Sequence, residues 1–581
     1  MRILFDLETD GLLDKLTRVH CGCLVRDESL TVERYHDDPA LPRTGTLAEM
    51  LALMDKAEAV GAHNALLFDI PALEKVYGWK PKGRVFDSRV VASSVWPDEH
   101  LRALDAISKR ELPKKVQGRN TIEAWGYRFG DRKGERPESW ETLTQEMLDY
   151  CAQDVVVLAK LVRKINGHQP TREQIELEQE FFLCIQRQID AGFAFDVARA
   201  EKLVAKLMAR RAELDTLIRA AFPDFVDVRY TPKKKLRRED VTPFNPNSRQ
   251  HIARGLSEKH GWRPKEFTPT GLPKVDETVM AALPYPEAKM LAEHALVQKR
   301  LGTLAEGDNA WLKLVQPDGR IHGYVAHNGA VTSRCTHRKP NTGNVPTTDA
   351  EYGTEMRECW VAAPGYVLVI GDASGIEARL LAHYAARFDG GELGRFLLEG
   401  DIHTRNAQVL GIPTRAKAKE FLYAVLYGAQ DTKAGEILGG SRAFGKLKRE
   451  KLLTSLPGLG RVIAGATADA KAYGYVVTLD GRRLWVRYAH AALNTLIQGA
   501  GAIVGKKAIV LLHRRLRELG VAFKQVGYVH DEIVVECRPE DAGVVAQALR
   551  DAIAEAGRHF RLRVPLESKV VNGPTWAAKA A

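Results

Sequence analysis

The chain has 581 residues, and at about 150 residues per domain this length predicts roughly four structural units. Hydrophobic residues make up 45% of it, enough for sizeable cores, and no uninterrupted apolar run reaches the ~18 residues that indicate a membrane span, which argues against a membrane protein. The formal net charge of +11 favours a polyanionic partner, although a well-solvated surface alone would give the same count.

The N-terminus and the cysteines indicate a reducing compartment. The segment MRILFDLETDG enters a strand-like run directly, without a signal or transit pattern, so we expect a cytoplasmic protein. Seven cysteines are scattered along the chain, and Cys21 with Cys23 forms a C-x-C that lacks the second pair of a zinc site. We therefore expect reduced and mostly buried thiols.

The first 165 residues alternate strand-like runs with helical stretches, which predicts an α/β unit. In the run ILFDLE, Asp6 and Glu8 are two positions apart. A strand would therefore place both carboxylates on one face, where they repel each other unless a cation lies between them. Ordinary surface acids near the following turn, TDG, are the alternative interpretation.

Two later segments of the same unit also carry acids. Asp69 ends the segment HNALLFD, and Tyr150 precedes Asp154 by four positions. The i,i+4 spacing places the phenol and the carboxylate on one face of a helix. Each segment alone is a weak signal, and the order of the three is more informative than any one of them.

Residues 170–320 are predicted to be mainly helical, with a basic loop, TPKKKLRRED, in the middle. The cations of this loop are Lys233, Lys234, Lys235, Arg237 and Arg238. Such a run is usually a solvated surface. Contact with phosphates is favoured if the neighbouring domains handle nucleic acid.

From residue 320 onward strand-like runs return, and two of them end in acids. YVLVIGDASGIEARLLAHY predicts a buried strand that continues into a helix, with Asp372 at the end of the strand. The spacing Ser374-x-x-Glu377 is compatible with a simple capping box. VGYVHDEIVVE predicts a β-hairpin whose polar tip carries Asp531, where a plain turn acid is the alternative.

A helix predicted between these acids carries a stripe of cations and rings. Arg415, Lys419, Tyr423 and Tyr427 follow each other at four-residue steps of about 400°, so they lie along one slowly drifting face about 18 Å long. That length spans a triphosphate, a sugar and a base. An amphipathic core helix is the alternative, but core stripes seldom begin with Arg and Lys. His403, just before this helix, is a further candidate for phosphate contact.

Several segments resemble those of known families. The three acidic segments of the N-terminal unit resemble the motifs of DEDDy-type 3′-to-5′ proofreading exonucleases. DASGIE, RAKAKEFLYAVLYG and VHDE resemble the three polymerase motifs of family A DNA polymerases. HCG, IEAWGYR, NGAVTSR, GDIHT and AHAALNTLIQGAGA resemble replicative phage members of that family, so the resemblance covers nearly the whole chain.

The resemblance implies a multidomain fold of the α/β and α+β classes. An RNase H-like 3′-5′ exonuclease domain is expected at residues 1–165, followed by a right-hand polymerase. The thumb is expected at 170–320, the palm at 320–400 and 481–581, and the fingers at 401–480.

The same resemblance implies the ligands of two metal sites, each with two Mg²⁺ ions that Mn²⁺ can replace. The ligands expected in the exonuclease site are Asp6, Glu8, Asp69 and Asp154. Tyr150 would position the attacking water there. The ligands expected in the polymerase site are Asp372, the Ala373 carbonyl and Asp531, with Glu532 near the primer end.

Substrate contacts are implied as well. The residues expected to bind the incoming dNTP are His403, Arg415, Lys419, Tyr423, Tyr427 and Glu377. Lys419 would also protonate the pyrophosphate, and Glu377 would act as a steric gate against ribose. The residues expected to contact the primer or the minor groove are Arg334, Gln498 and His530. Primer-template DNA is the implied partner, with a replicative helicase-primase and a single-stranded-DNA-binding protein as further candidates.

Two departures and three alternatives qualify this interpretation. PNTGNVP stands where many relatives have PNLQNIP, and only about twenty residues separate Phe222 from Phe244, where phage relatives carry a long insertion that captures thioredoxin. Thioredoxin is therefore not expected as a partner.

A single-subunit RNA polymerase would lack the exonuclease acids, and a non-catalytic accessory protein would need none of the acids. A repair-type family A polymerase of low processivity remains the main alternative to a replicative enzyme.

Overall fold

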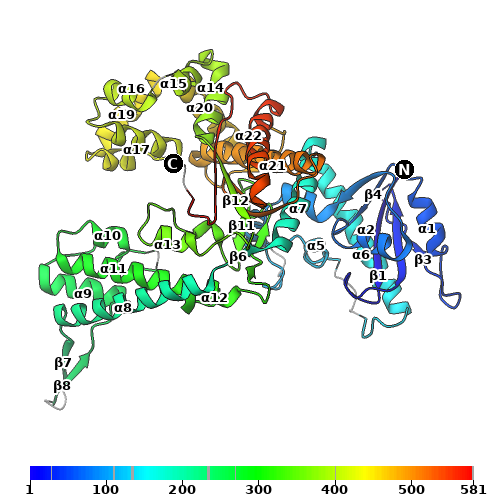
Figure 1. Cartoon of the computed structure of the whole chain (residues 1–581), viewed down its shortest axis with the longest axis horizontal. Coiled ribbons are helices and arrows are strands. Elements are labelled where there is room, and N and C mark those ends of the chain that lie inside the picture. The colour runs from blue at the N-terminus through cyan, green and yellow to red at the C-terminus, as the bar shows by residue number, and fades with distance from the viewer. Residues whose placement is uncertain are drawn as a thin grey trace.

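The computed structural model describes the chain except for residues 28, 109–111, 132–136, 232–235, 269, 400 and 579–581, and it describes no side chain at 228–238 or 399. Figure 1 shows an N-terminal lobe (blue) beside a larger body that carries two extensions, one at the top and one at the lower left. Of the predicted basic loop, residues 231–240, the part at 232–235 lies outside the described residues.

The N-terminal lobe is a five-stranded mixed sheet with helices on both faces. Its elements are β1 (Arg2–Thr9), β2 (Val19–Arg26), β3 (Glu33–Tyr35), α1 (Leu47–Met54), β4 (Ala59–Ala62), α2 (Asp69–Tyr77), β5 (Arg84–Asp87), α3 (Ser88–Val95), α4 (Asp98–Ile107), α5 (Ile122–Phe129) and α6 (Gln145–Gly167). The strand order is β3-β2-β1-β4-β5, with β1, β4 and β5 parallel and β2 and β3 antiparallel to their neighbours.

The alternation along β1 decides which face carries the acids. Ile3, Phe5 and Leu7 pack in the core under α1, whereas Leu4 packs in the core under α6. Because side chains alternate along a strand, Asp6 and Glu8 share the α6 face with Leu4. The acids are therefore placed between the sheet and α6 at the end of β1.

The next segment is mainly helical, as predicted. Its elements are α7 (Arg172–Ala191), β6 (Phe193–Ala194), α8 (Val197–Ala221), β7 (Phe225–Thr231), β8 (Leu236–Thr242), α9 (Arg249–His260), α10 (Glu277–Ala281), α11 (Pro286–Leu301), a π-helical turn (Gly302–Glu306), α12 (Trp311–Leu314), β9 (Arg320–Ile321), β10 (Tyr324–Ala326), β11 (Thr336–Arg338) and a 3₁₀ turn (Thr342–Asn344).

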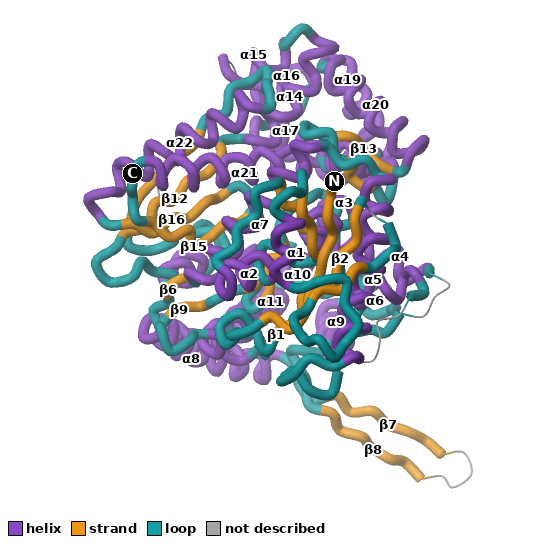
Figure 2. Tube along the Cα trace, turned by 90° about the vertical axis from the view of Figure 1, so that its right-hand side faces the viewer, coloured by secondary structure: helices purple, strands orange, loops and turns teal. Residues whose placement is uncertain are grey.

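One feature of this segment differs from the sequence prediction. The residues on either side of 232–235 form an antiparallel hairpin, β7–β8, where the sequence predicted only a loop. Figure 2 shows the hairpin projecting away from the rest of the molecule. The concentration of charge in TPKKKLRRED favoured a loop, although Val226, Val228 and Tyr230 alternate with Asp227 and Arg229 as in a strand.

The C-terminal half consists of a four-stranded antiparallel sheet, long helices and a helical extension. Its elements are α13 (Gly353–Glu358), β12 (Val367–Ala373), α14 (Ile376–Asp389), α15 (Glu392–Glu399), α16 (Ile402–Leu410), α17 (Arg415–Leu426), α18 (Asp431–Ile437), α19 (Arg442–Ser455), α20 (Pro457–Tyr473), β13 (Tyr475–Val477), β14 (Arg483–Trp485), a 3₁₀ turn (Ala489–Ala491), α21 (Ala492–Glu518), β15 (Phe523–Val529), β16 (Glu532–Cys537), a 3₁₀ turn (Pro539–Asp541), α22 (Ala542–His559) and β17 (Ser568–Gly573).

The sheet order is β15-β16-β12-β17, and its two faces belong to different cores. Val369 packs on the side of α21 and α22, whereas Leu368 and Ile370 pack on the side of α8 and α11. Both faces of the sheet are covered, so its strands are apolar almost throughout. The buried polar residues inside the strands have partners: Gln525 hydrogen-bonds Gln188, and Glu536 pairs with Arg320. Asp372 and Asp531 lie where the strands end.

Among the described residues, one helix is long and apolar enough to cross a membrane by length and composition, the segment Ala489–Glu518 that contains α21. Of its most apolar window, 72% is buried inside the protein. α21 packs against α7, α20 and α22, so its apolar surface is accounted for by the protein core.

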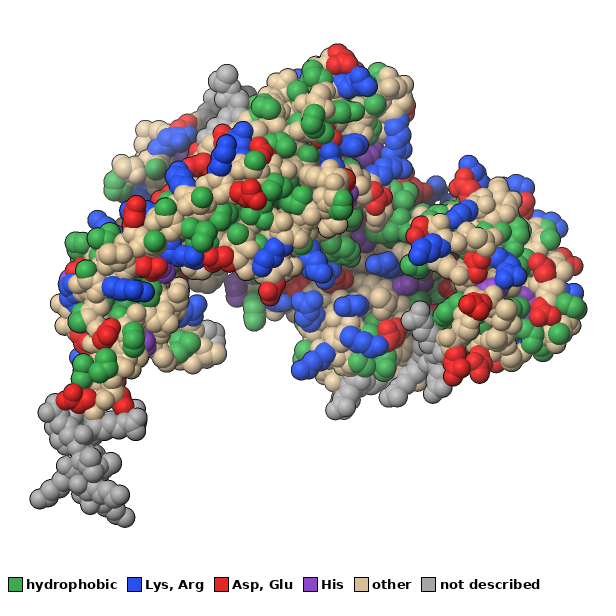
Figure 3. Space-filling model, turned by 60° about the horizontal axis from the view of Figure 1, so that its bottom comes forward, with side chains coloured by type: hydrophobic (Ala, Val, Ile, Leu, Met, Phe, Trp, Pro, Cys, Tyr) green, Lys and Arg blue, Asp and Glu red, His purple; other side chains and the backbone are tan. Residues whose placement is uncertain are grey.

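Basic and acidic side chains are interspersed over the face of the molecule that Figure 3 shows. The net charge of +11 is therefore not gathered in one patch on that face. The seven cysteines are all free, and only Cys335 is partly exposed, which confirms the expectation of mostly buried thiols.

Candidate active sites

The first site lies where β12 ends beside the β15–β16 turn. In the sheet register Asp372 is paired with Glu532, so Asp531, the preceding residue, lies next to the end of β12. Asp372 and Asp531 are close enough to share a hydrogen bond between their carboxyl groups. Burial, together with the Asp531 charge, raises the pKa of Asp372 to about 7. Burial also raises the pKa of Asp531.

Two neighbouring carboxyls with raised pKa values form a donor set that fits a divalent cation. Carboxylate oxygens and a main-chain carbonyl are the ligands that hard cations such as Mg²⁺ prefer. Asp372, Asp531 and the carbonyl of Ala373, all at this edge of the sheet, could hold such an ion.

Glu532 is already engaged by the protein. Its carboxylate accepts hydrogen bonds from Trp576 Nε1 at 2.5 Å and from Arg357 Nη1 at 3.4 Å. The structure therefore places Glu532 beside Asp372 but ties it to α13 and to the C-terminal segment.

A chain of contacts leads from these acids to the helical extension. Arg334 Nη2 forms an ion pair with Glu377 at 3.0 Å, and its charge also acts on Asp531. The hydroxyl of Tyr427 donates a hydrogen bond to the other oxygen of Glu377 at 2.6 Å. Glu377 is thus held between the acidic site and the end of α17.

This contact corrects the capping-box alternative for Glu377. The N-cap of α14 is Gly375, in the left-handed conformation, and no side chain caps this end. Glu377 points instead toward Arg334 and Tyr427. Glu377 therefore does not cap α14 but links Arg334 to Tyr427.

The cations and rings of α17 lie along one face, as the spacing predicted. The ring of Tyr423 lies 6.3 Å from that of Tyr427 and 6.1 Å from the imidazole of His403. Arg415 Nε is 2.5 Å from an oxygen of Asp401, the N-cap of α16, and the Arg415 and Lys419 charges both act on His403. All five predicted residues of this surface are therefore neighbours.

The remaining predicted DNA contacts are more dispersed. His530 occupies the exposed tip of the β15–β16 turn with φ 60°, close to His337, whose pKa it helps to lower. Gln498 is half-buried in the first turns of α21. His530 thus adjoins Asp531, while Gln498 belongs to the helix behind the sheet.

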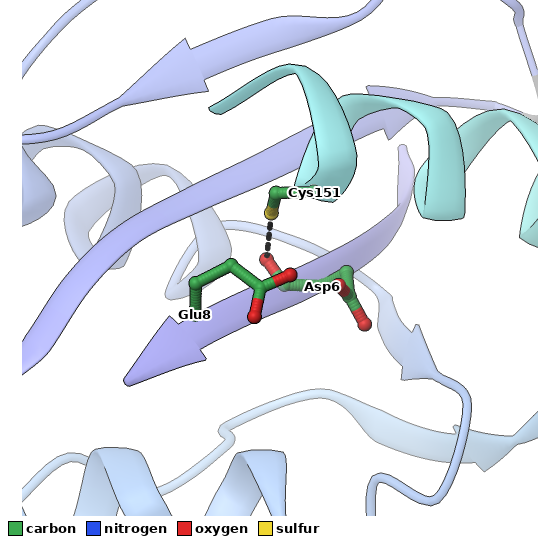
Figure 4. A group of neighbouring side chains, drawn as sticks. All are labelled: Asp6, Glu8 and Cys151. Carbon is green, nitrogen blue, oxygen red and sulfur yellow. Dashed lines mark hydrogen bonds between the residues drawn. The ribbon is translucent and has the colours of Figure 1, made fainter. Parts of the chain in front are cut away.

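The second site lies in the N-terminal lobe between β1 and α6. The carboxylate oxygens of Asp6 and Glu8 and the sulfur of Cys151 all lie within 4.8 Å of one another. Figure 4 shows the three side chains, with Cys151 directed from α6 toward β1. Asp154 is buried one helical turn farther along α6. The carboxylate pair fits a divalent cation on the same chemical grounds as the first site.

The other two predicted residues flank this group. Asp69 begins α2 and is fully buried; burial, together with the neighbouring Asp87 charge, raises its pKa to about 8. Tyr150, on α6, lies edge-to-face against Trp140 with ring centroids 6.0 Å apart. β1 is adjacent to β4, which leads into α2, so the acidic segments approach the same end of the sheet.

The sequence analysis missed two residues of this lobe. Cys151 follows Tyr150 and precedes Asp154 by three positions, so the same helical periodicity that singled out those two could have included it. Asp87 caps α3 through its oxygens and lies beside Asp69, and no spacing in the sequence connects those two acids.

Comparison with known proteins decides the family. The family model described as DNA polymerase family A matches residues 229–578, and the RNase H superfamily model matches residues 3–166. The chain belongs to DNA polymerase family A. This confirms the family and the fold class predicted from the sequence, an RNase H-like domain followed by a right-hand polymerase.

Relatives of this family A polymerase match almost end to end. It is 31% identical to the DNA-directed DNA polymerase of Escherichia phage T7 over 708 aligned positions, which cover 99% of each protein. The DNA-directed DNA polymerase of Enterobacteria phage T3 is also 31% identical, again with 99% of each covered. DNA polymerase I of Chloroflexus aurantiacus is 28% identical over 89% of this chain and 54% of its own length.

Among solved structures, the polymerase shares its fold with the POL domain of Pol1 from M. smegmatis in complex with DNA primer-template and dNTP. The TM-score is 0.73 at 20% identity, and the match covers 99% of this chain and 96% of the other. The alignment with the phage T7 protein is longer than 581 positions, so that protein has segments that this chain lacks.

Proposed function

We propose that this protein is a replicative DNA polymerase that extends a primer 3′ end with dNTPs and removes mispaired ends with its RNase H-like domain. The proposal is carried by one observation: Asp372 and Asp531 are joined through Arg334, Glu377 and Tyr427 to a helix whose exposed face bears cations and rings. A cation site next to a triphosphate-length surface suits nucleotidyl transfer.

The domains follow from this proposal. We assign residues 1–165 to the exonuclease, 170–320 to the thumb, 320–400 and 481–581 to the palm, and 401–480 to the fingers. The covered sheet with its acidic edge supports the palm assignment, and the helical extension that carries α17 supports the fingers.

Both sites are proposed to hold Mg²⁺ ions, two in each. When bound, these cations activate the attacking oxygen and neutralise the charge that develops on the phosphate. Asp372, Asp531 and the Ala373 carbonyl hold them in the palm. The proposed ligands in the exonuclease are Asp6, Glu8, Asp69 and Asp154.

The fingers residues are proposed to bind and orient the incoming nucleotide. Arg415, Lys419 and His403 bind the triphosphate oxygens, and Lys419 Nζ gives its proton to the departing pyrophosphate. Tyr423 packs on the sugar and base. Catalysis then depends on positioning and on charge compensation by groups that are in place before the nucleotide arrives.

Glu377 is proposed to exclude ribonucleotides. Its ion pair with Arg334 and its hydrogen bond from Tyr427 hold its side chain in one position. A carboxylate fixed in this way cannot move aside for a 2′ hydroxyl.

Three residues, Arg334, Gln498 and His530, are proposed to contact the primer end and the minor groove, where acceptors are present at every base pair. Tyr150 is proposed to orient the attacking water in the exonuclease.

The two activities are tested by paired variants. Asp372→Ala or Asp531→Ala should abolish primer extension while digestion of single-stranded DNA from its 3′ end persists. Asp6→Ala combined with Glu8→Ala should do the reverse, so each variant is the folding control for the other. Extension at the wild-type rate by either palm variant would refute the palm assignment.

A repair polymerase of low processivity is the second candidate, favoured by the absence of the segments that the phage T7 protein carries. The short spacing between Phe222 and Phe244 is the ground for expecting that thioredoxin is not a partner. Extension of a primer on a long single-stranded template, with a DNA trap that limits each enzyme to one binding event, separates the two. Short products that lengthen only with a helicase-primase or a single-stranded-DNA-binding protein would identify a replicative enzyme that relies on those partners.

A further inference from the structure

The exonuclease acids share their face of the sheet with thiols. In the β1–β2 register Asp6 is paired with Cys23 and Glu8 with Cys21, and directly paired residues of an antiparallel sheet project to the same side. α6 covers this side and contributes Cys151. Two carboxylates and three thiols therefore meet in one layer.

Cys151 is the thiol closest to the acids. Its sulfur and the carboxylate oxygens of Asp6 and Glu8 all lie within 4.8 Å of one another, and its S–H donates a hydrogen bond to the main-chain oxygen of Asp6 at 3.4 Å. The side chains of Cys21 and Cys23 also hydrogen-bond Cys151. Among the described residues, Asp6, Glu8 and Cys151 alone form such a compact group of potential metal ligands.

The chemistry of this group differs from that of the palm acids. Carboxylates alone favour hard cations such as Mg²⁺, whereas a thiolate ligand selects softer ions such as Zn²⁺. The two acids and one sulfur would supply three charged ligands, and the fourth position of a tetrahedral ion would stay open for water or a phosphate oxygen.

We propose that Cys151 joins Asp6 and Glu8 in binding one thiophilic divalent cation of the Zn²⁺ and Cd²⁺ class. On binding, the S–H bond breaks, the proton leaves to solvent and a sulfur–metal bond forms in its place. The hydrogen bond from Cys151 to the Asp6 main chain breaks in the same step. The cation occupies the exonuclease site in preference to the palm, which makes the exonuclease the metal-sensitive activity of the protein.

Cd²⁺ is the probe, because bonds between cadmium and thiolate absorb in the ultraviolet. Titration of the full-length protein without DNA should give this absorption and a calorimetric binding isotherm. Mutation of a residue that only hydrogen-bonds to a metal ligand lowers metal affinity by about 10- to 100-fold. Removal of a ligand should cost at least as much, so Cys151→Ser should weaken Cd²⁺ binding by at least about tenfold and remove the absorption. Cys184→Ser, which removes another buried thiol in α7, is the matched control and should change neither.

Retention of the absorption and of the affinity by Cys151→Ser would overturn the proposal, because the metal would then be bound elsewhere. If Cys151→Ser does not fold, X-ray absorption at the cadmium edge of the wild-type complex decides the question. A shell that contains sulfur together with oxygen supports the proposal, and a shell of oxygen alone overturns it.

The consequence for activity rests on the proposed function. In a Mg²⁺ buffer, low Cd²⁺ should inhibit 3′-end digestion by the wild type, inhibit it at least about tenfold less effectively in Cys151→Ser, and leave primer extension unchanged in both. A wild type that binds Cd²⁺ through sulfur but never digests DNA would refute the exonuclease and leave the metal site standing. Equal inhibition of digestion in both proteins would refute the role of Cys151.

Discussion

At the scale of single residues, Tyr423 is the clearest case in which the position of a side chain predicts selectivity. It is half-buried, with burial raising its pKa, and its ring lies between His403 and Tyr427. On the proposed function its hydroxyl can fill the space left when a nucleotide lacks its 3′ hydroxyl. The wild type should therefore accept dideoxynucleotides readily.

Tyr423→Phe should fold and polymerise normally but discriminate against dideoxynucleotides by at least about tenfold more than the wild type, because nothing then replaces the missing hydroxyl. The measurement is the ratio of kcat/KM for matched deoxy and dideoxy substrates. Tyr384→Phe is the control: its hydroxyl contacts Thr478 at 3.3 Å, and its removal should cost stability without changing the ratio. An identical ratio in wild type and Tyr423→Phe would remove Tyr423 from the sugar site.

At the scale of elements, the β7–β8 hairpin and the buried contacts of α7 have opposite characters. The hairpin projects from the molecule, and it is anchored at its base, where Arg254 pairs with Asp227 at 3.0 Å and stacks over Phe225 at 4.2 Å. The buried contacts of α7 are ion pairs of Glu178 with Arg482 and Lys506, whose side chains are fully buried. The projecting hairpin suggests a surface that binds a partner. The buried ion pairs of α7 suggest contacts that stabilise the fold.

Replacing Lys233, Lys234, Lys235, Arg237 and Arg238 with Ser should weaken duplex DNA binding and flatten its salt dependence. The slope of log K against log salt should fall by up to about 0.9 for each phosphate that the variant no longer neutralises. Binding isotherms at several salt concentrations test this. Neutralising Lys80 and Lys82, which pair with acids on the N-terminal lobe, is the control, and an unchanged slope in the hairpin variant would make the loop a merely solvated surface.

Glu178 of α7 is the centre of the buried network. Its oxygens accept hydrogen bonds from Lys506 Nζ and Asn328 Nδ2, each at 2.7 Å, and it also pairs with Arg482, which is fully buried. Burial alone would raise the pKa of Glu178, but the Lys506 and Arg482 charges outweigh it and lower the pKa to about 2. The network joins α7 to α21 and to the loop that ends at Arg334.

Glu178→Gln should lower the free energy of unfolding by about 3–5 kcal/mol, because Lys506 then lacks a buried counter-charge and Arg482 keeps only Asp480 as its partner. Glu180→Gln, on the same helix but in an exposed pair with Arg514, should cost only about 0–1 kcal/mol. Denaturant unfolding measures both. Since the folded pKa is depressed, the wild-type contribution is complete above the ordinary pKa near 4.5 and is lost as pH falls toward 2, whereas the Gln variant lacks this dependence.

At the scale of the whole molecule, a cleft of about 1130 Å³ lies between the N-terminal lobe and the part of the larger body formed by α7, β10 and β11. Arg89, Arg102, Arg119 and Arg338 line it, and the charges of all four act on the partly buried Asp98. The excess of positive charge suits a single strand that passes between the sites. The lobes are fixed beside the cleft by main-chain bonds such as Glu99 N–H to Gly329 O at 3.2 Å.

Arg102→Ala combined with Arg119→Ala should slow the removal of a mismatched primer end from duplex DNA, because fewer cations then hold the phosphates of the strand on its way to the exonuclease. Digestion of single-stranded DNA and extension of a matched primer should remain near the wild-type rates. Rapid-quench kinetics on the three substrates make the comparison. Mismatch removal that is as fast as in the wild type would show that the cleft plays no part in transfer.

Much of the fold could be predicted from local patterns. Alternation along ILFDLE, the apolar run before Asp372 and the two arms around Asp531 each specify a strand, and their partners are close in sequence or strongly apolar. The hairpin at 225–242 was not predicted, because the charged run TPKKKLRRED favours a loop over a strand. The capping-box interpretation of Glu377 failed for a related reason, because a short spacing cannot show that Arg334, 43 residues earlier, lies beside it.

The sequence by itself determined the family, the acids at the ends of β1 and β12 and in the β15–β16 turn, and the cation-and-ring face of α17, because each of these features depends on residues within one strand, turn or helix. Only the tertiary structure decided which distant groups meet: Cys151 with Asp6 and Glu8, Asp87 with Asp69, and Glu178 with Arg482 and Lys506. The members of each group belong to different elements, and their contacts depend on how sheets and helices pack. Packing follows from the burial of apolar surface across the whole molecule, which no single segment of sequence encodes.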